Sequence, residues 1–173
     1  TEEWPATVSG FADLLTNPGY HTVAGGRPLL YFFDIEPMNQ RFGSWARARA
    51  AVDELRAAAR TAGSRDPYIV GLANPARRAA ELAEMLGFDA IGAYSAIGSG
   101  TDGDRPYADL RRANEAFWSE ALATGKSVVT SVSVGWDPRP RLAAHAPGQG
   151  STSILWYRAP QPDELQQHVE RAV

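Results

Sequence analysis

Residues 28–35 read PLLYFFDI, and this short, aromatic-rich and almost uninterrupted apolar run predicts a buried β-strand. Runs of this kind are typical of parallel strands that are covered on both faces. Three further segments have a similar character: YIVGL at 68–72, DAIGAYS at 89–95 and SVVTSVSV at 127–134. The four runs predict a core of parallel strands.

Helical patterns lie before, between and after these runs. Ser44 and Asn74 are suited to cap two of them. The clearest pattern starts at Tyr107, where apolar residues recur every three or four positions up to Ala121, and Gly125 ends it. Alternation of strands and helices implies a parallel sheet with right-handed crossovers. The expected helices span about 4–15, 44–62, 74–86, 107–121 and 162–172.

Two architectures fit this alternation, a doubly wound open sheet and a piece of a (β/α)8 barrel. Small residues in the strands favour the barrel, whose interior layers need them, although small residues facing packed helices would look the same. No glycine-rich phosphate fingerprint follows the first run, which disfavours a nucleotide-binding open sheet. We predict a partial TIM-type barrel of parallel strands, with residues 1–173 as a single domain. The small residues are Gly71, Gly92, Ser131, Ser133 and Gly135.

The number of strands is too small for a closed barrel. Such a barrel has eight strands in about 250 residues, whereas this chain offers four β/α units, or five if 154–157 is extended. A half barrel would leave unpaired edges and an exposed apolar face. We therefore expect either that the chain is part of a longer protein or that two copies associate.

The composition excludes several classes of protein. The net charge is −3 and no basic run occurs, so we expect no nucleic-acid partner. No apolar run approaches the about 20 residues of a membrane span, so we expect no membrane partner. The absence of cysteine excludes disulfides and thiolate metal sites. No signal peptide is visible, which leaves both a cytoplasmic and a secreted location open.

Two carboxylates follow the first strand, and function in parallel α/β folds gathers at the carboxyl ends of strands. Strand alternation places Asp34 and Glu36 on the same side. They can serve as an acid and a base, or as a pair of metal ligands. In the alternative reading, one caps the next loop and the other pairs with an arginine. Both are candidate catalytic residues.

Other strand ends carry candidate substrate-binding residues. Tyr94 can donate to a sugar hydroxyl or to a catalytic carboxylate, or it can be a packed aromatic residue. In the segment 135–141, GWDPRPR, the tryptophan offers a flat face for a sugar, and the charged residues can bind hydroxyls or orient a carboxylate. A structural Asp–Arg pair beneath a tryptophan is the alternative. The candidates are Tyr94, Trp136, Asp137, Arg139, Arg141 and His145.

The remaining polar residues suggest no other chemistry. His21, His145 and His168 match no metal motif, so we expect neither a metal nor another cofactor. His168 lies on a predicted helix and is expected at the surface. No nucleophile elbow surrounds Ser131 or Ser133, which disfavours a serine hydrolase.

The order of four segments resembles glycoside hydrolase family 99, the endo-α-mannosidase family, and its WbsX-like relatives. The resemblance covers roughly residues 18–172, and its most specific parts are GFDA at 87–90 and the segment 135–141. It implies a (β/α)8 barrel whose cleft, lined by Asp34, Tyr94 and the Trp136-Asp137 loop, takes a carbohydrate. The four segments are GRPLLYFFDIEP (26–37), PYIVGL (67–72), GFDAIGAYSAIG (87–98) and VVTSVSVGWDPRPR (128–141).

The chain departs from this family at the catalytic pair. The family's acid and base are glutamates of an Asn-Glu-Trp…Glu-Gly motif on a later strand, and these 173 residues do not contain it. Glu36 is the local carboxylate that could replace one of them. Three hypotheses follow: a glycoside hydrolase or part of one, a non-catalytic carbohydrate-binding or scaffold module, and a barrel enzyme that uses Asp34 and Glu36 on a metal.

Overall fold

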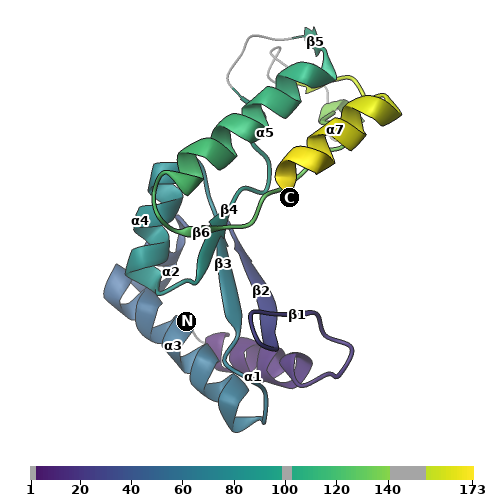
Figure 1. The fold of residues 1–173 in the computed structure, drawn as a ribbon. Coiled ribbons are helices and arrows are strands. Elements are labelled where there is room, and N and C mark those ends of the chain that lie inside the picture. The colour runs from purple at the N-terminus through teal and green to yellow at the C-terminus, as the bar shows by residue number, and fades with distance from the viewer. Residues whose placement is uncertain (1–2, 99–102, 141–154) are drawn as a thin grey trace. The chain divides into compact units, whose positions relative to one another are not determined.

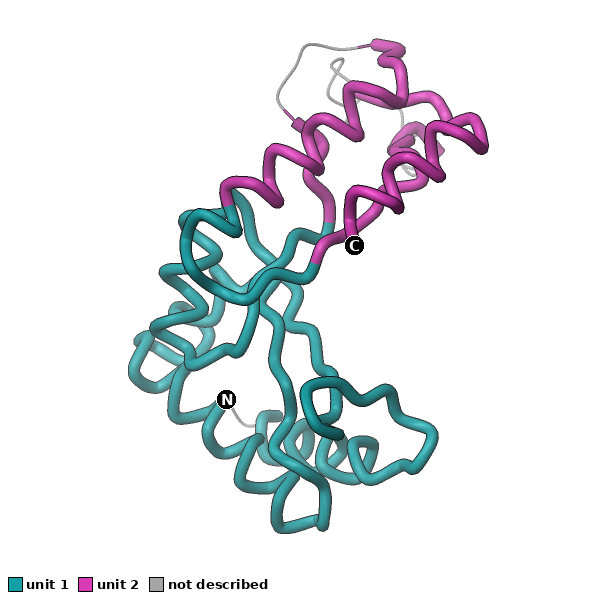
Figure 2. The backbone as a smooth tube through the Cα atoms, viewed as in Figure 1, with its two compact units in different colours: residues 1–94, 121–129 teal, residues 95–120, 130–173 magenta. Residues whose placement is uncertain are grey.

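The computed structural model describes residues 3–98, 103–140 and 155–173 (Figure 1). The chain divides into two compact units (Figure 2). Unit 1 comprises residues 1–94 and 121–129, and unit 2 comprises residues 95–120 and 130–173. The organisation of residues 1–173 as a single domain stays a prediction. No helix among the described residues combines the length and the apolar character that crossing a bilayer requires.

Unit 1 is built on a five-stranded sheet with the order β1-β2-β3-β4-β6. The strands β2, β3, β4 and β6 pair in parallel, as the sequence predicts. The sheet is nevertheless mixed, because β1 pairs antiparallel with β2 through a turn in which Ala24, Gly25 and Gly26 all have positive φ. The bounds are β1 (Thr22–Val23), β2 (Arg27–Phe33), β3 (Tyr68–Leu72), β4 (Ala90–Gly92) and β6 (Ser127–Val128).

The helices of unit 1 follow local signals in the sequence. Ser44 caps α3, since its Oγ accepts a hydrogen bond from the Arg47 N–H at 3.2 Å, and α4 ends at Gly87 in the left-handed conformation. The N-cap position of α4 is Pro75, one residue after the predicted Asn74. The short helix α2 was not predicted. The bounds are α1 (Trp4–Leu15), α2 (Met38–Phe42), α3 (Trp45–Thr61) and α4 (Ala76–Leu86).

The core of unit 1 lies where α3 and α4 pack with the sheet (Figure 1). Its fully buried aliphatic side chains include Ile35, Val52, Leu55, Ile69, Val70, Leu82, Leu86 and Ile91. Gly71 is needed there, because a Cβ at this position would lie 2.6 Å from Cδ2 of Phe88. The expectation that every strand is covered on both faces is wrong for β2, where Tyr31 and Phe33 are exposed.

Unit 2 is smaller, and its described residues include two long helices and a two-stranded parallel sheet. Residues 155–157 do extend, as predicted, and form β7. The predicted strand 127–134 is shortened to β6, and Trp136 forms an isolated bridge with Tyr157 of β7. A cluster of Tyr107, Leu110 and Tyr157 forms its core, with Trp136 and Leu165 packed against it. The bounds are β5 (Gly103–Arg105), α5 (Tyr107–Leu122), β7 (Leu155–Tyr157) and α7 (Pro162–Ala172).

Candidate functional site

Asp34 follows β2 and adopts a left-handed backbone conformation, with φ 53°. This conformation is uncommon for a residue other than glycine, and it is frequent at functional sites. Because β2 ends at Phe33, strand alternation no longer relates Asp34 to Glu36. Asp34 lines a cavity of about 220 Å³ together with Trp4, Phe33 and Arg41. Its carboxylate is exposed and has no partner among the described residues.

Glu36 is engaged in an ion pair with Arg78 of α4. Its two carboxylate oxygens accept hydrogen bonds from Nε and Nη2 of Arg78 at 2.6 and 3.0 Å. The guanidinium also bonds Glu81 and lies 5.8 Å from the centre of the Trp45 ring. The hydrogen bonds from Arg78 lower the pKa of Glu36. Glu36 therefore stays ionised and is poorly suited to act as a general acid.

Tyr94 lies just beyond β4 and is 64% exposed. Its ring meets that of Phe33 edge to face, with 4.8 Å between the centroids. Phe33 and Asp34 line the same cavity, so Phe33 connects Tyr94 to that cavity, although β3 lies between β2 and β4 in the sheet. Tyr94 is thus exposed and also packed on Phe33, and its role as a ligand contact stays a prediction.

The segment 135–141 contributes to a second site, within unit 2. Asp137 holds Arg139 through two side-chain hydrogen bonds, of 2.8 Å to Nε and 2.7 Å to Nη2. The Arg139 guanidinium lies 3.7 Å above the centre of the Trp156 ring. The hydrogen bonds from Arg139 lower the pKa of Asp137. This stack borders an open pocket of about 380 Å³ that Trp136, Tyr157 and Arg158 also line.

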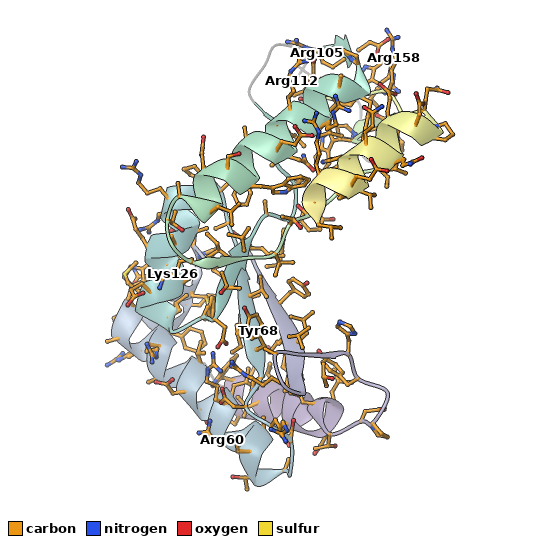
Figure 3. The ribbon with its side chains drawn as sticks, in the orientation of Figure 1. Arg60, Tyr68, Arg105, Arg112, Lys126 and Arg158 are labelled. Atoms are coloured by element: carbon orange, nitrogen blue, oxygen red, sulfur yellow. The ribbon has the colours of Figure 1, made fainter. Side chains whose placement is uncertain are left out.

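Arg158 is the second cation of this pocket. Its Nε bonds both carboxylate oxygens of Asp104 on β5, at 2.9 and 3.0 Å. Figure 3 shows Arg158 near Arg105 and Arg112 at the β5 end of unit 2. Arg105 and Arg112 both pair with Asp109 of α5. The basic side chains that gather there are therefore matched by carboxylates.

Two of the predicted binding residues, Asp137 and Arg139, line this pocket, and their role in binding stays a prediction. Trp136 lines it but is packed on the unit 2 core, whereas the ring that supports a stack is that of Trp156. Trp156 was missed because only the pairing of β7 with residue 136 brings it to this segment. Arg141 and His145 lie outside the described residues.

His168 is fully buried, so the prediction of a surface position is wrong. It lies on the face of α7 that packs on Tyr107 and Trp118 of α5. Residues 3–98, 103–140 and 155–173 contain no group of three or more His, Asp or Glu side chains that could hold a metal ion. The described residues therefore give no support to a metal at Asp34 and Glu36.

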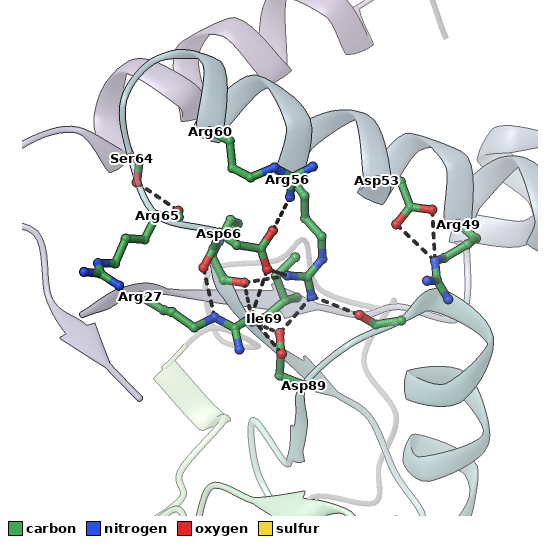
Figure 4. A network of polar contacts seen from close by, with 12 residues as sticks. Arg27, Arg49, Asp53, Arg56, Arg60, Ser64, Arg65, Asp66, Ile69 and Asp89 are labelled. Carbon is green, nitrogen blue, oxygen red and sulfur yellow. Dashed lines mark hydrogen bonds and ion pairs between the residues drawn. The ribbon is translucent and has the colours of Figure 1, made fainter. Parts of the chain in front are cut away.

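The GFDA segment at 87–90 has a structural role (Figure 4). Asp89 accepts hydrogen bonds from Arg27, Arg56 and the Ile69 N–H, at 2.8 to 2.9 Å. Burial raises the pKa of Asp89, but these hydrogen bonds outweigh burial and lower it. Asp66 joins the network through the same arginines and Arg60. The network lies at the start of β3 and β4, opposite the carboxyl ends where function is expected.

Comparisons of this chain with family models, with curated proteins and with solved structures give no match. The resemblance to glycoside hydrolase family 99 therefore stays a prediction.

Proposed function

We propose that this chain belongs to a carbohydrate-active protein and binds a carbohydrate in the unit 2 pocket. The observation that carries the proposal is the stack in which Asp137 holds the Arg139 guanidinium over the Trp156 ring. A guanidinium on an aromatic face is flat and rich in hydrogen-bond donors. Such a surface suits a sugar ring, which has an apolar face and a rim of hydroxyl groups.

The charge balance of the pocket favours a neutral ligand over an anion. Arg139 is paired with Asp137 and Arg158 with Asp104, so each pocket arginine is matched by a carboxylate. A phosphate would have to compete with these carboxylates for the guanidinium groups. Hydroxyl groups can both donate and accept without displacing either partner.

Unused hydrogen-bonding capacity remains on the stack. A guanidinium has five N–H donors, and Arg139 uses one each from Nε and Nη2 on Asp137. The Nη1 group has no partner among the described residues. A volume of about 380 Å³ lies within the range of small-ligand pockets, roughly 300–1,000 Å³. The pocket can therefore accept one or two sugar rings.

We also propose that the sheet of unit 1 is part of a (β/α)8 barrel, and the order of its strands supports this. The parallel strands β2, β3, β4 and β6 follow one another in the sheet as in the chain. Strands of a (β/α)8 barrel are neighbours in sequential order, whereas a doubly wound sheet reverses its order at a switch point. No reversal occurs among these four strands. Unit 1 therefore resembles consecutive strands of a barrel more closely than a nucleotide-binding sheet.

Hydrolysis of a carbohydrate at the unit 1 cavity is a second candidate function, and Asp34 is the observation that favours it. Asp34 presents an exposed carboxylate from a left-handed backbone into a cavity at a strand end. A glycosidase needs two carboxyl groups, one of them protonated before the reaction. The shifted carboxyl pKa values among the described residues, those of Glu36, Glu84, Asp89 and Asp137, are all lowered. Binding is therefore supported better than hydrolysis.

Calorimetric titration of the whole chain with neutral oligosaccharides of mannan, xylan, arabinan and α-glucan tests the binding proposal. Arg139→Ala is expected to weaken binding by tenfold or more, because it removes the donors and the support of the stack. Arg78→Ala is the matched control, since it removes a guanidinium that lies over a tryptophan in unit 1. Equal loss in both variants, or no saturable binding of any sugar, would contradict the proposal.

Release of reducing sugar from the same panel tests hydrolysis separately. If Asp34 takes part in the chemistry, Asp34→Asn abolishes the release of reducing sugar. Glu36→Gln should retain the release, because the Glu36 carboxylate is already bound by Arg78. Release that survives Asp34→Asn would show that Asp34 is not a catalytic residue. Binding without release in the unsubstituted protein would support the non-catalytic module.

A further inference from the structure

The contact between α5 and α7 in unit 2 contains unusually polar buried groups. Among the described residues, four buried side-chain atoms have no hydrogen-bond partner: Arg111 Nε, Glu115 Oε1, Trp118 Nε1 and His168 Nε2. Three of them come from one face of α5 and the fourth from α7. Buried polar atoms are nearly always paired, so such a concentration points to a functional or strained contact.

Hydrogen-bond directions determine the protonation state of the His168 ring. The Tyr107 hydroxyl donates to the Ser133 carbonyl at 2.8 Å, which uses its single proton. The same oxygen lies 2.6 Å from Nδ1 of His168 and must accept there. Nδ1 is therefore the protonated nitrogen, and a neutral ring leaves Nε2 as a bare acceptor. The ring is fully buried and stacks on Trp118 with 5.1 Å between the centroids.

The charged groups around His168 disfavour a second proton on the ring. Arg111 of α5 and Arg171 of α7 are cations, and among the described residues Glu115 of α5 is the carboxylate that acts on the ring. Glu115 is already shared: Oε2 accepts from Arg171 at 2.8 Å, and Oε1 lies 3.7 Å from Arg111 Nε, too far for a hydrogen bond. A protonated ring would add a third positive charge beside one anion, at a site without water contact.

We propose that His168 is an acid-sensitive lock, which holds α7 on α5 while its ring is neutral and releases α7 when the ring takes up a proton. The lock acts through the Tyr107 hydroxyl, which links His168 to the Ser133 carbonyl of the segment that leads to the unit 2 pocket. Arg111–Gln167 and Arg171–Glu115 are further polar links between the two helices, and Gln167 and Arg171 lie one and three residues from His168 in sequence. The lock concerns the stability of unit 2 and does not depend on the proposed function.

The sign of the effect follows from linkage. Burial lowers the pKa of His168 below 6.5, the two arginines act in the same direction, and Glu115 opposes them. A histidine released from the contact therefore binds a proton more readily than the locked one. The contact is fully stable above pH 6.5 and loses stability as the pH falls from 6.5 to the lowered pKa. Amide exchange in α7 should accelerate by up to roughly tenfold per pH unit in that window, after correction for the intrinsic rate.

Nuclear magnetic resonance of the whole chain tests the lock directly. At pH 7.5 the ring nitrogens of His168 should show the proton on Nδ1, and its titration midpoint should lie below 6.5. Glu115→Gln should move the midpoint to lower pH and Arg171→Gln to higher pH, because these changes remove charges of opposite sign. A proton on Nε2, a midpoint at or above 6.5, or equal shifts in both variants would overturn the proposal.

Amide exchange of α7 between pH 7.5 and 5.5 provides the functional readout. His168→Leu should make the corrected exchange independent of pH, because it removes the titrating group and retains an apolar side chain. His21→Gln, at an exposed histidine of unit 1, should leave the acid-dependent exchange of α7 unchanged. Persistence of the acid effect in a folded His168→Leu protein would contradict the lock. If His168→Leu does not fold, the opposite midpoint shifts still decide the question.

Discussion

The two units of the chain each contain a network of arginines and carboxylates, and the two networks differ in completeness. In unit 1, Asp66 and Asp89 take hydrogen bonds from Arg27, Arg56, Arg60 and the Ile69 N–H. In unit 2, Arg111, Glu115 and Arg171 surround His168, and four buried atoms there lack a partner among the described residues.

The difference teaches how the same residue types serve two purposes. A half-buried carboxylate whose oxygens accept several hydrogen bonds, such as Asp89, fixes the start of β3 and β4 and stays ionised over a wide range of pH. A polar cluster with unpaired atoms is less stable, because each unpaired buried group costs about 1–3 kcal/mol. The stability of the cluster around His168 depends on whether the His168 ring binds a second proton. We therefore regard unit 1 as the rigid part of the chain and unit 2 as its adjustable part.

The largest expected effect is the loss of the complete network. Asp89→Asn should lower the free energy of unfolding of unit 1 by about 3 kcal/mol, because it removes one of the two carboxylates that pair with the partly buried Arg27 and Arg56. Urea denaturation followed by circular dichroism measures this. Asp53→Asn, which removes an exposed pair with Arg49, should cost less than about 0.5 kcal/mol. Similar losses in the two variants would mean that the network does not hold unit 1 together.

The next effect concerns packing in the rigid unit. Gly71→Val should destabilise the protein by about 2 kcal/mol, because the new side chain would overlap Phe88 and approach Ile35. Gly10→Ala is the matched control, since a Cβ at this position in α1 meets nothing within 4 Å. A helical alanine should raise the free energy of unfolding by about 0.5–1 kcal/mol. A Gly71→Val protein as stable as the unsubstituted one would contradict the close contact between Gly71 and Phe88.

The two networks should lose stability at different pH values as the solution is acidified. Unit 2 should begin to lose amide protection below pH 6.5, where a released His168 takes up a proton. The contribution of Asp89 to unit 1 should persist until the pH falls below its ordinary pKa of 3.8, because its pKa is lowered in the folded protein. Residue-resolved hydrogen exchange across this range measures the order. If amide protection were lost in both units at the same pH, or in unit 1 first, unit 2 would not be the more acid-sensitive unit.

The smallest effect is expected at Glu36. Its pair with Arg78 is exposed, so Glu36→Gln should change the free energy of unfolding at pH 7 by less than about 1 kcal/mol. The pKa of Glu36 is lowered by Arg78, so its small contribution is present at neutral pH and is lost as the pH falls below 4.5. Thermal unfolding at pH 7 and pH 4 measures both statements. A loss of more than about 2 kcal/mol in the free energy of unfolding would show that the Glu36–Arg78 pair stabilises unit 1 as strongly as the Asp89 network does.

The sequence by itself determined the local elements. Ser44 marks the start of α3 and Gly87 the end of α4, because capping depends on residues within one turn. The apolar runs at 28–35 and 68–72 became β2 and β3, and four strands are parallel as expected. The α/β class was therefore predictable from patterns that span only a few residues. The strand β1 was not, since its two residues carry no periodic signal.

Only the tertiary structure decided which residues meet. Glu36 finds Arg78 at a separation of 42 residues, and Asp89 finds Arg27 at a separation of 62. His168 occurs in a helix with many polar residues, which indicated a surface position, yet α5 covers it completely. Trp156 reaches Arg139 because β7 pairs with the chain at Trp136. Pairing, burial and protonation depend on neighbours distant in the chain, and one sequence carries no periodic signal of them.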